Sequence, residues 1–305
     1  MSVRLSYTAV PEDGAKPVKL ILKHRLGLSE RLVKKLKYAG KVLCNSTPVH
    51  ADHRVKPGDV VEAVVDFEEQ NESIIPEDIA IDVIYEDESI TVVNKQAGIV
   101  VHPTAYHPSG TVANALAFRQ AKRGESSLIR PVSRLDRGTS GIIVFARNPY
   151  VQEKLIRQMS AGTYHKEYLG VVHGVMAEPT GRIDLPIARK PGSIMLREIN
   201  DSGAPSVTAY ELIEALRGAS FLKFVLETGR THQIRVHCQA IGHALIGDTL
   251  YPRPDENLPS AEADIGRQAL HSFKTRFLHP VSGHSLELEA PLPADILRVL
   301  EILRK

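Results

Sequence analysis

Residues Pro131–Gly141, PVSRLDRGTSG, run directly into Ile142–Ala146, IIVFA. The second segment is continuously apolar and rich in β-branched residues, which predicts a strand that is buried on both faces. Gly138 and Gly141 permit backbone angles that other residues avoid, so we expect a tight turn just before this strand. A turn that is fixed against a buried strand is a rigid mount for a reactive side chain.

Asp136 is the acidic residue of this turn, and no other acid occurs between Glu125 and Glu153. The positive charges of Arg134 and Arg137 favour an ionised carboxyl group if they point the same way. Two interpretations follow from the residues alone. Asp136 either closes the turn beside solvated arginines, as most aspartates in such turns do, or it is a reactive carboxylate.

The string Arg-Leu-Asp-x-x-Thr-Ser-Gly, followed by an apolar strand, closely resembles the signature of the RluA-type RNA pseudouridine synthases. Three more segments resemble other motifs of that family, and all four occur in the family's order. The resemblance covers roughly residues 80–295. The further segments are Asn94–Gly98 with His102 and Pro103, Lys166-x-Tyr168 with Gly174, and Gly229–His237 with Gly242, His243, Gly247 and Asp248.

The resemblance implies an isomerisation of selected uridines in RNA, without a metal or a cofactor. Asp136 is then the catalytic carboxylate, which acts at the ribose of the target uridine as a nucleophile or as a base. Arg235 corresponds to the arginine that pairs with this carboxylate. Tyr168 corresponds to the active-site tyrosine, which can stack on the base and assist proton transfer at carbon 5.

Further residues of the second and fourth motifs are predicted to contact RNA. Arg134 is expected to help extrude the nucleotide or to hold a phosphate, because the target atom cannot be reached in a stacked helix. Two residues depart from the family pattern: Ser133 stands where histidine is usual, and Gln96 where proline is usual. The serine can change how the RNA is held. The other predicted RNA contacts are Arg137, Thr139, Arg230, His232 and Gln233.

The 305 residues suffice for a large domain and a small one, and 43% hydrophobic with 24% charged residues is typical of a soluble globular protein. We place the boundary in the polar segment 66–78, with one domain at 1–75 and the other at 76–305. Many short predicted strands and few helices indicate an α+β fold with a mixed, mostly antiparallel sheet. The strands are predicted at 81–85, 90–94, 142–146, 166–172, 207–213, 221–227, 270–278 and 285–289, the helices at 111–120, 149–159, after 229 up to Gly242, and 294–303, and a loop at 252–266.

The first domain is basic. Between Lys16 and Val65 eleven lysines and arginines face four acids, a net charge of +7, and the rest of the chain is therefore −5. Predicted helices at 18–26 and 30–39, with Ser29 as a helix cap, and short strands at 42–44 and 60–65 resemble the S-four-type RNA-binding domain. The alternative is an ordinary solvated face. The predicted RNA-binding residues here are Arg31, Lys34, Lys35 and Lys37.

Other classes find little support in the sequence. Cys44 and Cys238 are too few for a disulfide framework or a cysteine-rich zinc site. His232 and His237 are five residues apart, which does not place them on one helical face, so we expect no metal site. No signal peptide and no apolar stretch of about 18 residues is present, which predicts a cytoplasmic protein outside the membrane. We expect a monomer.

Two other functions are alternatives to an RNA pseudouridine synthase. A non-catalytic RNA-binding or ribosome-assembly protein on the same scaffold has no need of Asp136, Tyr168 and Arg235 together. A glycoside hydrolase usually needs two carboxylates, and none of the four motifs offers a second catalytic acid. The sequence does not identify the RNA. The resemblance favours large-subunit ribosomal RNA, with transfer RNA as the alternative.

Overall fold

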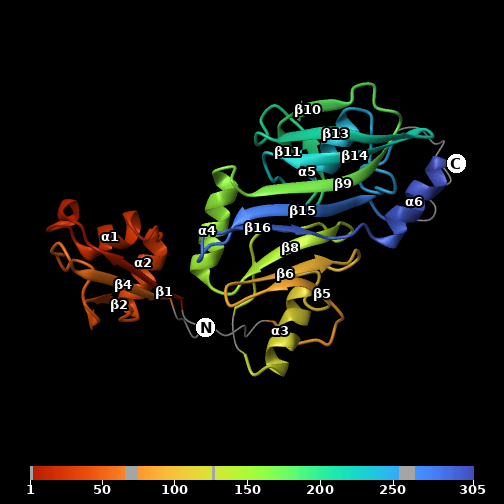
Figure 1. Ribbon diagram of the computed structural model, residues 1–305. Helices are drawn as coiled ribbons and strands as arrows, with labels where there is room; N and C mark the ends of the chain where they lie inside the picture. The colour runs from red at the N-terminus through yellow and green to blue at the C-terminus, as the bar shows by residue number, and fades with distance from the viewer. Residues whose placement is uncertain (1–2, 66–73, 126–127, 254–264) are drawn as a thin grey trace.

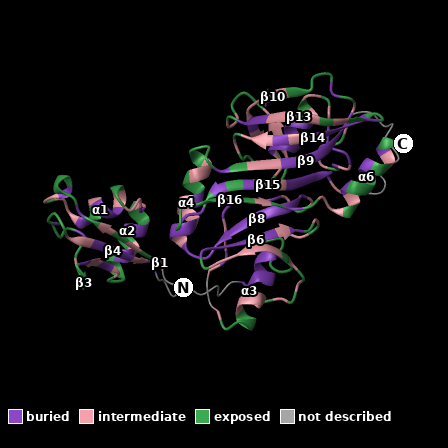
Figure 2. Cartoon of the chain, in the orientation of Figure 1, coloured by how far each residue is buried: buried purple, intermediate pink, exposed green. Residues whose placement is uncertain are grey.

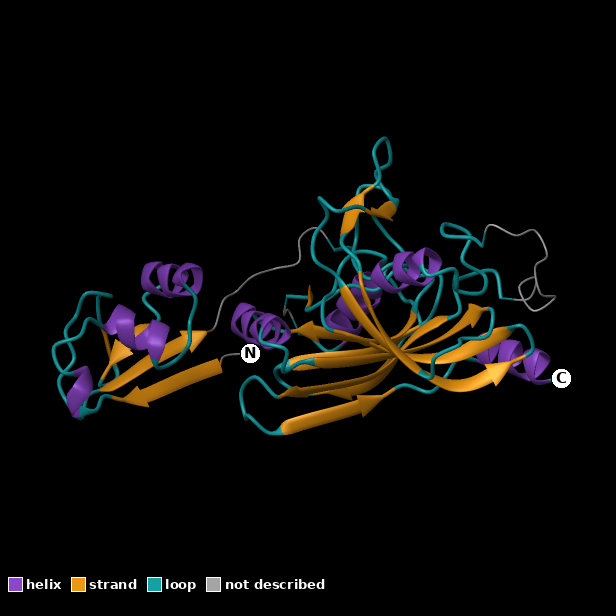
Figure 3. Cartoon of the chain, turned by 90° about the horizontal axis from the view of Figure 1, so that it is seen from above, coloured by secondary structure: helices purple, strands orange, loops and turns teal. Residues whose placement is uncertain are grey.

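The computed structural model describes residues 3–65, 74–125, 128–253 and 265–305 (Figure 1). Residues 3–65 form a small N-terminal domain. The other described residues build a larger domain around one long sheet, and the smaller domain lies beside one end of it (Figure 3). In the described residues no helix is both long and apolar enough to cross a membrane.

The N-terminal domain is a four-stranded antiparallel sheet with two helices. Its strand order is β1-β4-β2-β3, and the predicted cap is present because Ser29 Oγ accepts a hydrogen bond from the Leu32 amide at 3.1 Å. Leu32, Val33 and Leu36 are buried, while the basic residues of the helix other than Lys35 are exposed. The elements are β1 (Val3–Thr8), η1 (Pro11–Asp13), α1 (Val18–His24), α2 (Glu30–Tyr38), β2 (Val42–Cys44), β3 (Thr47–Pro48) and β4 (Val60–Val65).

The larger domain has a ten-stranded sheet in which eight strands follow the order β10-β13-β14-β9-β15-β8-β6-β5. β16 pairs with β15, and β7 pairs with β8. Every pairing is antiparallel except that of β8 with β15, so the predicted mixed, mostly antiparallel sheet is confirmed. The strands are β5 (Asp82–Glu86), β6 (Ile90–Lys95), β7 (Arg130–Pro131), β8 (Ser140–Ala146), β9 (His165–His173), β10 (Thr180–Asp184), β13 (Val207–Leu216), β14 (Ala219–Leu226), β15 (Leu270–Leu278) and β16 (Ser285–Glu289).

Four helices accompany this sheet, each close to its predicted position (Figure 1). Thr111 and Asn148 cap the first two, each accepting a hydrogen bond from a backbone amide three residues on. Pro149 occupies the first position of the second helix, where its missing N–H costs nothing. The helices are α3 (Val112–Lys122), α4 (Pro149–Ser160), α5 (Gln233–Ala240) and α6 (Ala294–Arg304).

Several short strands were not predicted. They span two to five residues, and sequences such as TGRID and REI lack the apolar alternation that indicates a strand. Most of the predicted loop at 252–266 and the first part of the linker lie outside the described residues. The strands in question are β3, β7, β10, β11 (Ile187–Arg189) and β12 (Arg197–Ile199).

β8 is the strand that the opening stretch predicted, and all seven of its residues are buried (Figure 2). Ile142 and Val144 pack into one hydrophobic cluster, and Ile143 and Phe145 into another. Burying one such side chain stabilises the fold by about 1.5–3 kcal/mol. The strand therefore lies between two cores, which makes it a rigid support for the turn in front of it.

The turn at 136–139 closes with a hydrogen bond from the Thr139 amide to the Asp136 carbonyl, 3.1 Å. Gly141 has the expected unusual backbone angle, φ +105°, and a Cβ there would stand 2.2 Å from the Ser272 carbonyl oxygen. Gly138 does not have a positive φ. A Cβ at this position would lie 2.5 Å from Gln268 Oε1, so the Gln268 side chain would have to move.

The two domains touch at α4. Ser29 Oγ donates to Glu153 Oε1 at 2.7 Å, and the Arg157 guanidinium donates to the Gly27 carbonyl. On the far side of residues 66–73, Ile74 packs into the core of the larger domain, and the Ile75 carbonyl accepts a hydrogen bond from Asn114. Residues 74 and 75 therefore pack with the larger domain.

Candidate active site

Sheet register brings three of the four motifs into one row. Lys95 on β6 pairs with Gly141 on β8, Gly141 with Ser272 on β15, and Ser272 with Tyr168 on β9. Residues from distant parts of the sequence thus lie on neighbouring strands. The Asp136 turn comes directly before β8, one of the two inner strands of this row.

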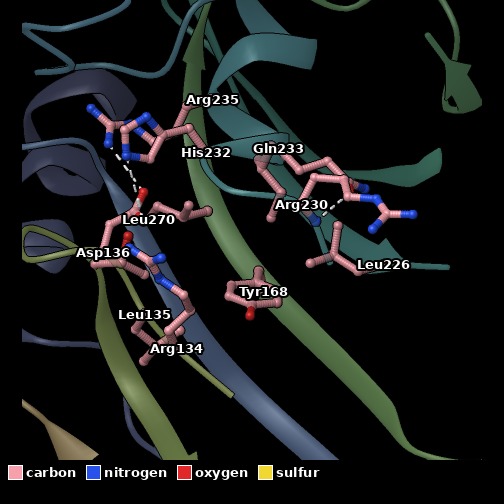
Figure 4. Close-up of a pocket in the computed structure, with 12 residues that line it drawn as sticks. Arg134, Leu135, Asp136, Tyr168, Leu226, Arg230, His232, Gln233, Arg235 and Leu270 are labelled. Atoms are coloured by element: carbon pink, nitrogen blue, oxygen red, sulfur yellow. Dashed lines mark hydrogen bonds and ion pairs between the residues drawn. The ribbon is translucent and has the colours of Figure 1, made fainter. Parts of the chain in front are cut away.

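Asp136 pairs with Arg235, as predicted. Arg235 Nη1 donates to Asp136 Oδ2 at 3.0 Å (Figure 4). The remaining edge of the guanidinium is held by Asp248, since Nε and Nη2 each donate to one of its oxygens at 2.7 Å. Two-point contact of this kind fixes the direction of the guanidinium as well as its position.

Asp248 is the anchor of this arrangement, and its role was not predicted, although it was quoted with the fourth motif. Its side chain has 0% exposure, and Oδ1 also accepts the amides of Leu250 and Tyr251. Burial alone would lower the pKa of Arg235, but the hydrogen bonds and charges of Asp248 and Asp136 raise it above its ordinary value. Arg235 is therefore a fixed cation between two carboxylates.

His232 lies on the other oxygen of Asp136, with Nε2 3.7 Å from Oδ1. It precedes α5 in the left-handed region, φ 58°. The Tyr251 hydroxyl accepts the Arg197 amide at 2.8 Å and shares a hydrogen bond of 2.8 Å with His232 Nδ1, whose direction depends on the tautomer of the ring. Burial lowers the pKa of His232 although Asp136 opposes this. A ring that is neutral at physiological pH thus faces the carboxylate.

Tyr168 is buried on β9 and forms a wall of the cleft together with Leu226 and Leu270 (Figure 4). Burial raises the pKa of its hydroxyl to about 12, with a further increase from Asp136 and an opposing hydrogen bond to Ser272. The phenol is therefore neutral at physiological pH. It offers an aromatic face and a proton, but no phenolate.

The cleft consists of two cavities of about 60 Å³ and 320 Å³ that share much of their lining. Exposed Arg134 and Arg230 line both of them. This is a concave, partly apolar site with a few convergent polar groups, as small-molecule and nucleotide sites usually are. The shared residues are Arg134, Asp136, Tyr168, Leu226, Arg230 and His232.

Two predicted RNA contacts, Thr139 and Gln233, lie at the cleft but are buried. Gln268 donates to the Thr139 hydroxyl at 3.0 Å. The Gln233 amide donates to the Val207 carbonyl and the Thr208 hydroxyl and accepts from Thr228 and from the Arg230 amide. These polar groups are occupied by the protein, so they shape the cleft from behind its surface.

Three of the predicted RNA contacts line the cleft, namely Arg134, Arg230 and His232. The remaining ones lie away from it. Arg137 is exposed, and its Nε donates to the Gly98 carbonyl at 2.8 Å, so it ties the second motif to the first. The four basic residues predicted in the N-terminal domain belong to α2. Arg31, Lys34 and Lys37 are exposed, and Lys35 is half-buried.

Lys95 belongs to the first motif, but the sequence predicts no role for it. It is only 1% exposed, and its Nζ donates to the carbonyls of Gln96, Ile99 and Arg137 at 3.0–3.2 Å. Burial and the charge of Arg267 lower its pKa to about 7, against an opposing effect of Asp136. Lys95 thereby holds the Asp136 turn against the turn after β6.

In the described ranges, the one group of three side chains that could hold a metal is Cys44, His53 and Asp59, whose ligand atoms lie within 4.8 Å of one another. It belongs to the N-terminal domain. Both Asp59 oxygens already accept hydrogen bonds, from Asn45 Nδ2 and from the Lys56 amide.

Comparison with known proteins shows the family of this chain. The sequence profile of the RNA pseudouridylate synthases matches residues 89–240. The RNA pseudouridine synthase YjbO of Bacillus subtilis is 36% identical over 277 residues, which are 90% of this chain and 95% of that protein. This chain belongs to the RNA pseudouridylate synthase family. It is thus an isomerase that acts on uridine in RNA.

Other relatives of this synthase include the ribosomal large subunit pseudouridine synthase D of Xanthomonas campestris, 38% identical over 88% of this chain and 82% of that one. The human RNA pseudouridylate synthase domain containing 1 has a similar structure, with a TM-score of 0.57 and 27% identity over 70% of this chain and 83% of that one. The human domain containing 4 shares the fold, with a TM-score of 0.61 and 20% identity over 73% and 93% of the two chains.

Proposed function

We propose that this synthase uses Asp136 as its catalytic carboxylate and acts on large-subunit ribosomal RNA. The observation that carries the proposal is the position of Asp136. It lies at the lip of a doubly buried strand, faces a cavity, and is fixed by an arginine that a second, fully buried aspartate holds in turn. Such preorganisation is what a group that reacts needs.

The reaction breaks the bond between carbon 1′ and N1, turns the uracil, and forms a bond from carbon 1′ to carbon 5. The proton on carbon 5 is lost and N1 gains one, so the product is an isomer of the substrate. Asp136 can attack carbon 1′ as a nucleophile or remove a ribose proton as a base. In either case the freed uracil must stay in the cleft, and Tyr168, Leu226 and Leu270 provide apolar walls for it.

The target nucleotide must leave its helix to reach this cleft. Arg134 is suited to assist, because it is exposed, lines both cavities and directly precedes the Leu135-Asp136 pair. A guanidinium at this place can hold a phosphate or fill the gap that the extruded base leaves.

The choice of RNA rests on the relatives. Several proteins that are 35–38% identical to this chain are named ribosomal large subunit pseudouridine synthase D, which favours large-subunit ribosomal RNA over transfer RNA. The N-terminal domain is proposed to be an S-four-like RNA-binding module. Its α2 carries exposed Arg31, Lys34 and Lys37, which suit the phosphate backbone.

The alternatives fit the site less well. A glycoside hydrolase needs a second accessible acid. Glu227, the other carboxylate that lines the larger cavity, is paired with Arg182 at 3.0 Å, and Asp248 has no exposure. A protein that only binds RNA has no need for a carboxylate held in this way.

Purified Asp136→Asn tests the proposal against the binding-only alternative. We expect it to form no pseudouridine in large-subunit ribosomal RNA transcribed in vitro, while its affinity stays within a few-fold of wild type because phosphate contacts dominate binding. Asp201→Asn, at an exposed position outside the cleft, is the control and should be fully active. Turnover near wild type in Asp136→Asn would remove Asp136 from the mechanism.

A further inference from the structure

Lys166 lies two residues before Tyr168 on β9 and lines the larger cavity. Its Nζ donates to Ser133 Oγ at 2.7 Å and lies 5.5 Å from the centroid of the Tyr164 ring. Within the described part of the chain it forms no ion pair with a carboxylate. Lys166 is half-buried, and an ammonium group that is partly removed from water without a counter-ion carries a desolvation cost.

The larger cavity as a whole also contains cations that have no acidic partner. Three cations line it, Arg134, Lys166 and Arg230, and none of them pairs with an acid of the described residues. Its two carboxylates are already engaged, Asp136 by Arg235 and Glu227 by Arg182. The cavity is thus a partly enclosed site whose three cations have no carboxylate left to pair with.

The anion must reach the cavity together with the reacting nucleotide. Asp136 lines this cavity too, so a ribose placed at Asp136 brings its own phosphates to the cavity wall. Val132, Met159 and Tyr164 form the apolar part of that wall and strengthen an ionic contact by excluding water. RNA phosphate is the anion that is always present one bond from the ribose.

We propose that Lys166, oriented by the Ser133 hydroxyl, binds an RNA phosphate that adjoins the target uridine. The proposal rests on the function proposed above and adds to it the residue that seats the backbone of the extruded nucleotide. It also gives Ser133 a role at the position where the family usually has histidine. A hydroxyl accepts the lysine hydrogen bond and leaves two ammonium protons for the phosphate.

The contact makes binding depend on pH. Burial lowers the pKa of Lys166 to about 8, so the ammonium is charged at pH 7 and mostly neutral at pH 9. A bound phosphate raises this pKa. The phosphate contact is therefore fully present below about pH 8 and is lost as the pH rises from there through the higher pKa of the complex. The arginines around the cavity keep their charge throughout, the pKa of His232 lies lower, and that of Tyr168 lies near 12. The titratable and charged groups that share the cavity with Lys166 are Arg134, Asp136, Tyr164, Tyr168, Glu227, Arg230 and His232.

The test compares full-length wild type with Lys166→Met and Lys166→Arg, using transcribed large-subunit ribosomal RNA. For Lys166→Met at pH 7 we expect KM to rise about tenfold, kcat to stay within threefold, and the slope of log affinity against log salt to fall by about 1. Between pH 7 and 9, KM should rise more for wild type than for either variant, because methionine has no charge to lose and arginine keeps its charge. The titration of Lys95 is common to all three proteins, so the difference between them isolates Lys166. Lys122→Met, on the exposed face of α3, should match wild type.

An unchanged KM and salt slope in Lys166→Met, or a loss confined to kcat, would overturn the proposal. So would a wild-type KM that does not change between pH 7 and 9. Lys166→Arg keeps the pH test available if Lys166→Met folds poorly, which its thermal midpoint would show. Failure of the underlying function looks different, because wild type itself would then form no pseudouridine in this RNA.

Discussion

The active-site cleft and helix α2 both use basic residues, but in opposite ways. In the cleft Arg235 is 5% exposed, and its guanidinium donates hydrogen bonds to both Asp136 and Asp248. Behind the Asp136 turn, the Lys95 ammonium donates to three backbone carbonyl groups. On α2, Arg31, Lys34 and Lys37 are exposed to solvent. Chemistry at one carbon atom requires fixed charges, whereas attraction to an RNA backbone requires only their presence.

The largest expected effect is that of Arg235→Met. It leaves the buried Asp248 carboxylate without its cation, which should lower the free energy of unfolding by about 3–5 kcal/mol. It also releases Asp136, and a catalytic group that shifts by 1 Å can cost about 10²-fold in rate. Arg31→Met on α2 is the matched control and should change stability by less than about 0.5 kcal/mol.

Denaturant unfolding and single-turnover kinetics of the two variants measure this contrast. If Arg235→Met were as stable and as active as Arg31→Met, the fixed arrangement in the cleft would have no importance.

Two glycines with a positive φ give a smaller, purely structural contrast. Gly141 has φ +105° and an added Cβ would meet the Ser272 backbone at 2.2 Å, while Gly40 after α2 has φ +65° with nothing within 4 Å. Alanine at residue 40 should therefore cost only the strain of the left-handed backbone, about 1–2 kcal/mol. Gly141→Ala must in addition separate β8 from β15, so we expect a loss of more than about 3 kcal/mol. Equal thermal midpoints for Gly40→Ala and Gly141→Ala would show that β8 and β15 are not as tightly joined as described.

The smallest effect on turnover should come from α2. Replacing Arg31, Lys34 and Lys37 together by glutamine should weaken RNA binding and lower the salt slope by up to about 3, because each residue contacts at most one phosphate. With saturating RNA, kcat should stay within twofold of wild type. Filter binding at several salt concentrations measures the slope. A slope that does not change would mean that this face of α2 does not meet the RNA.

Features that rest on a strong local pattern could be predicted from the sequence. The Asp136–Arg235 pair was predictable because a rigid turn before a doubly buried strand leaves a strong local pattern, and family resemblance linked it to a residue 99 positions away. Helix caps such as Ser29 and Asn148 were predictable for the same local reason.

Contacts that only the folded sheet creates were not predictable. The row that joins Lys95 to Tyr168 depends on strand register. The anchoring of Arg235 by Asp248 depends on how the loop after α5 packs back on that helix. Short edge strands such as β10 and β12 carry no apolar period, so their pairing is decided by tertiary contacts. Gly138 does not have the unusual backbone angle that was expected of it, and its close neighbour, the Gln268 side chain, comes from a distant part of the sequence.

Mapping pseudouridine in the ribosomal and transfer RNA of cells that lack this protein tests the central claim most directly. The account predicts that one or more positions in large-subunit ribosomal RNA stay uridine in these cells, that the wild-type gene restores them, and that an Asp136→Asn gene does not. An unaltered pseudouridine map, or restoration by Asp136→Asn, would contradict it.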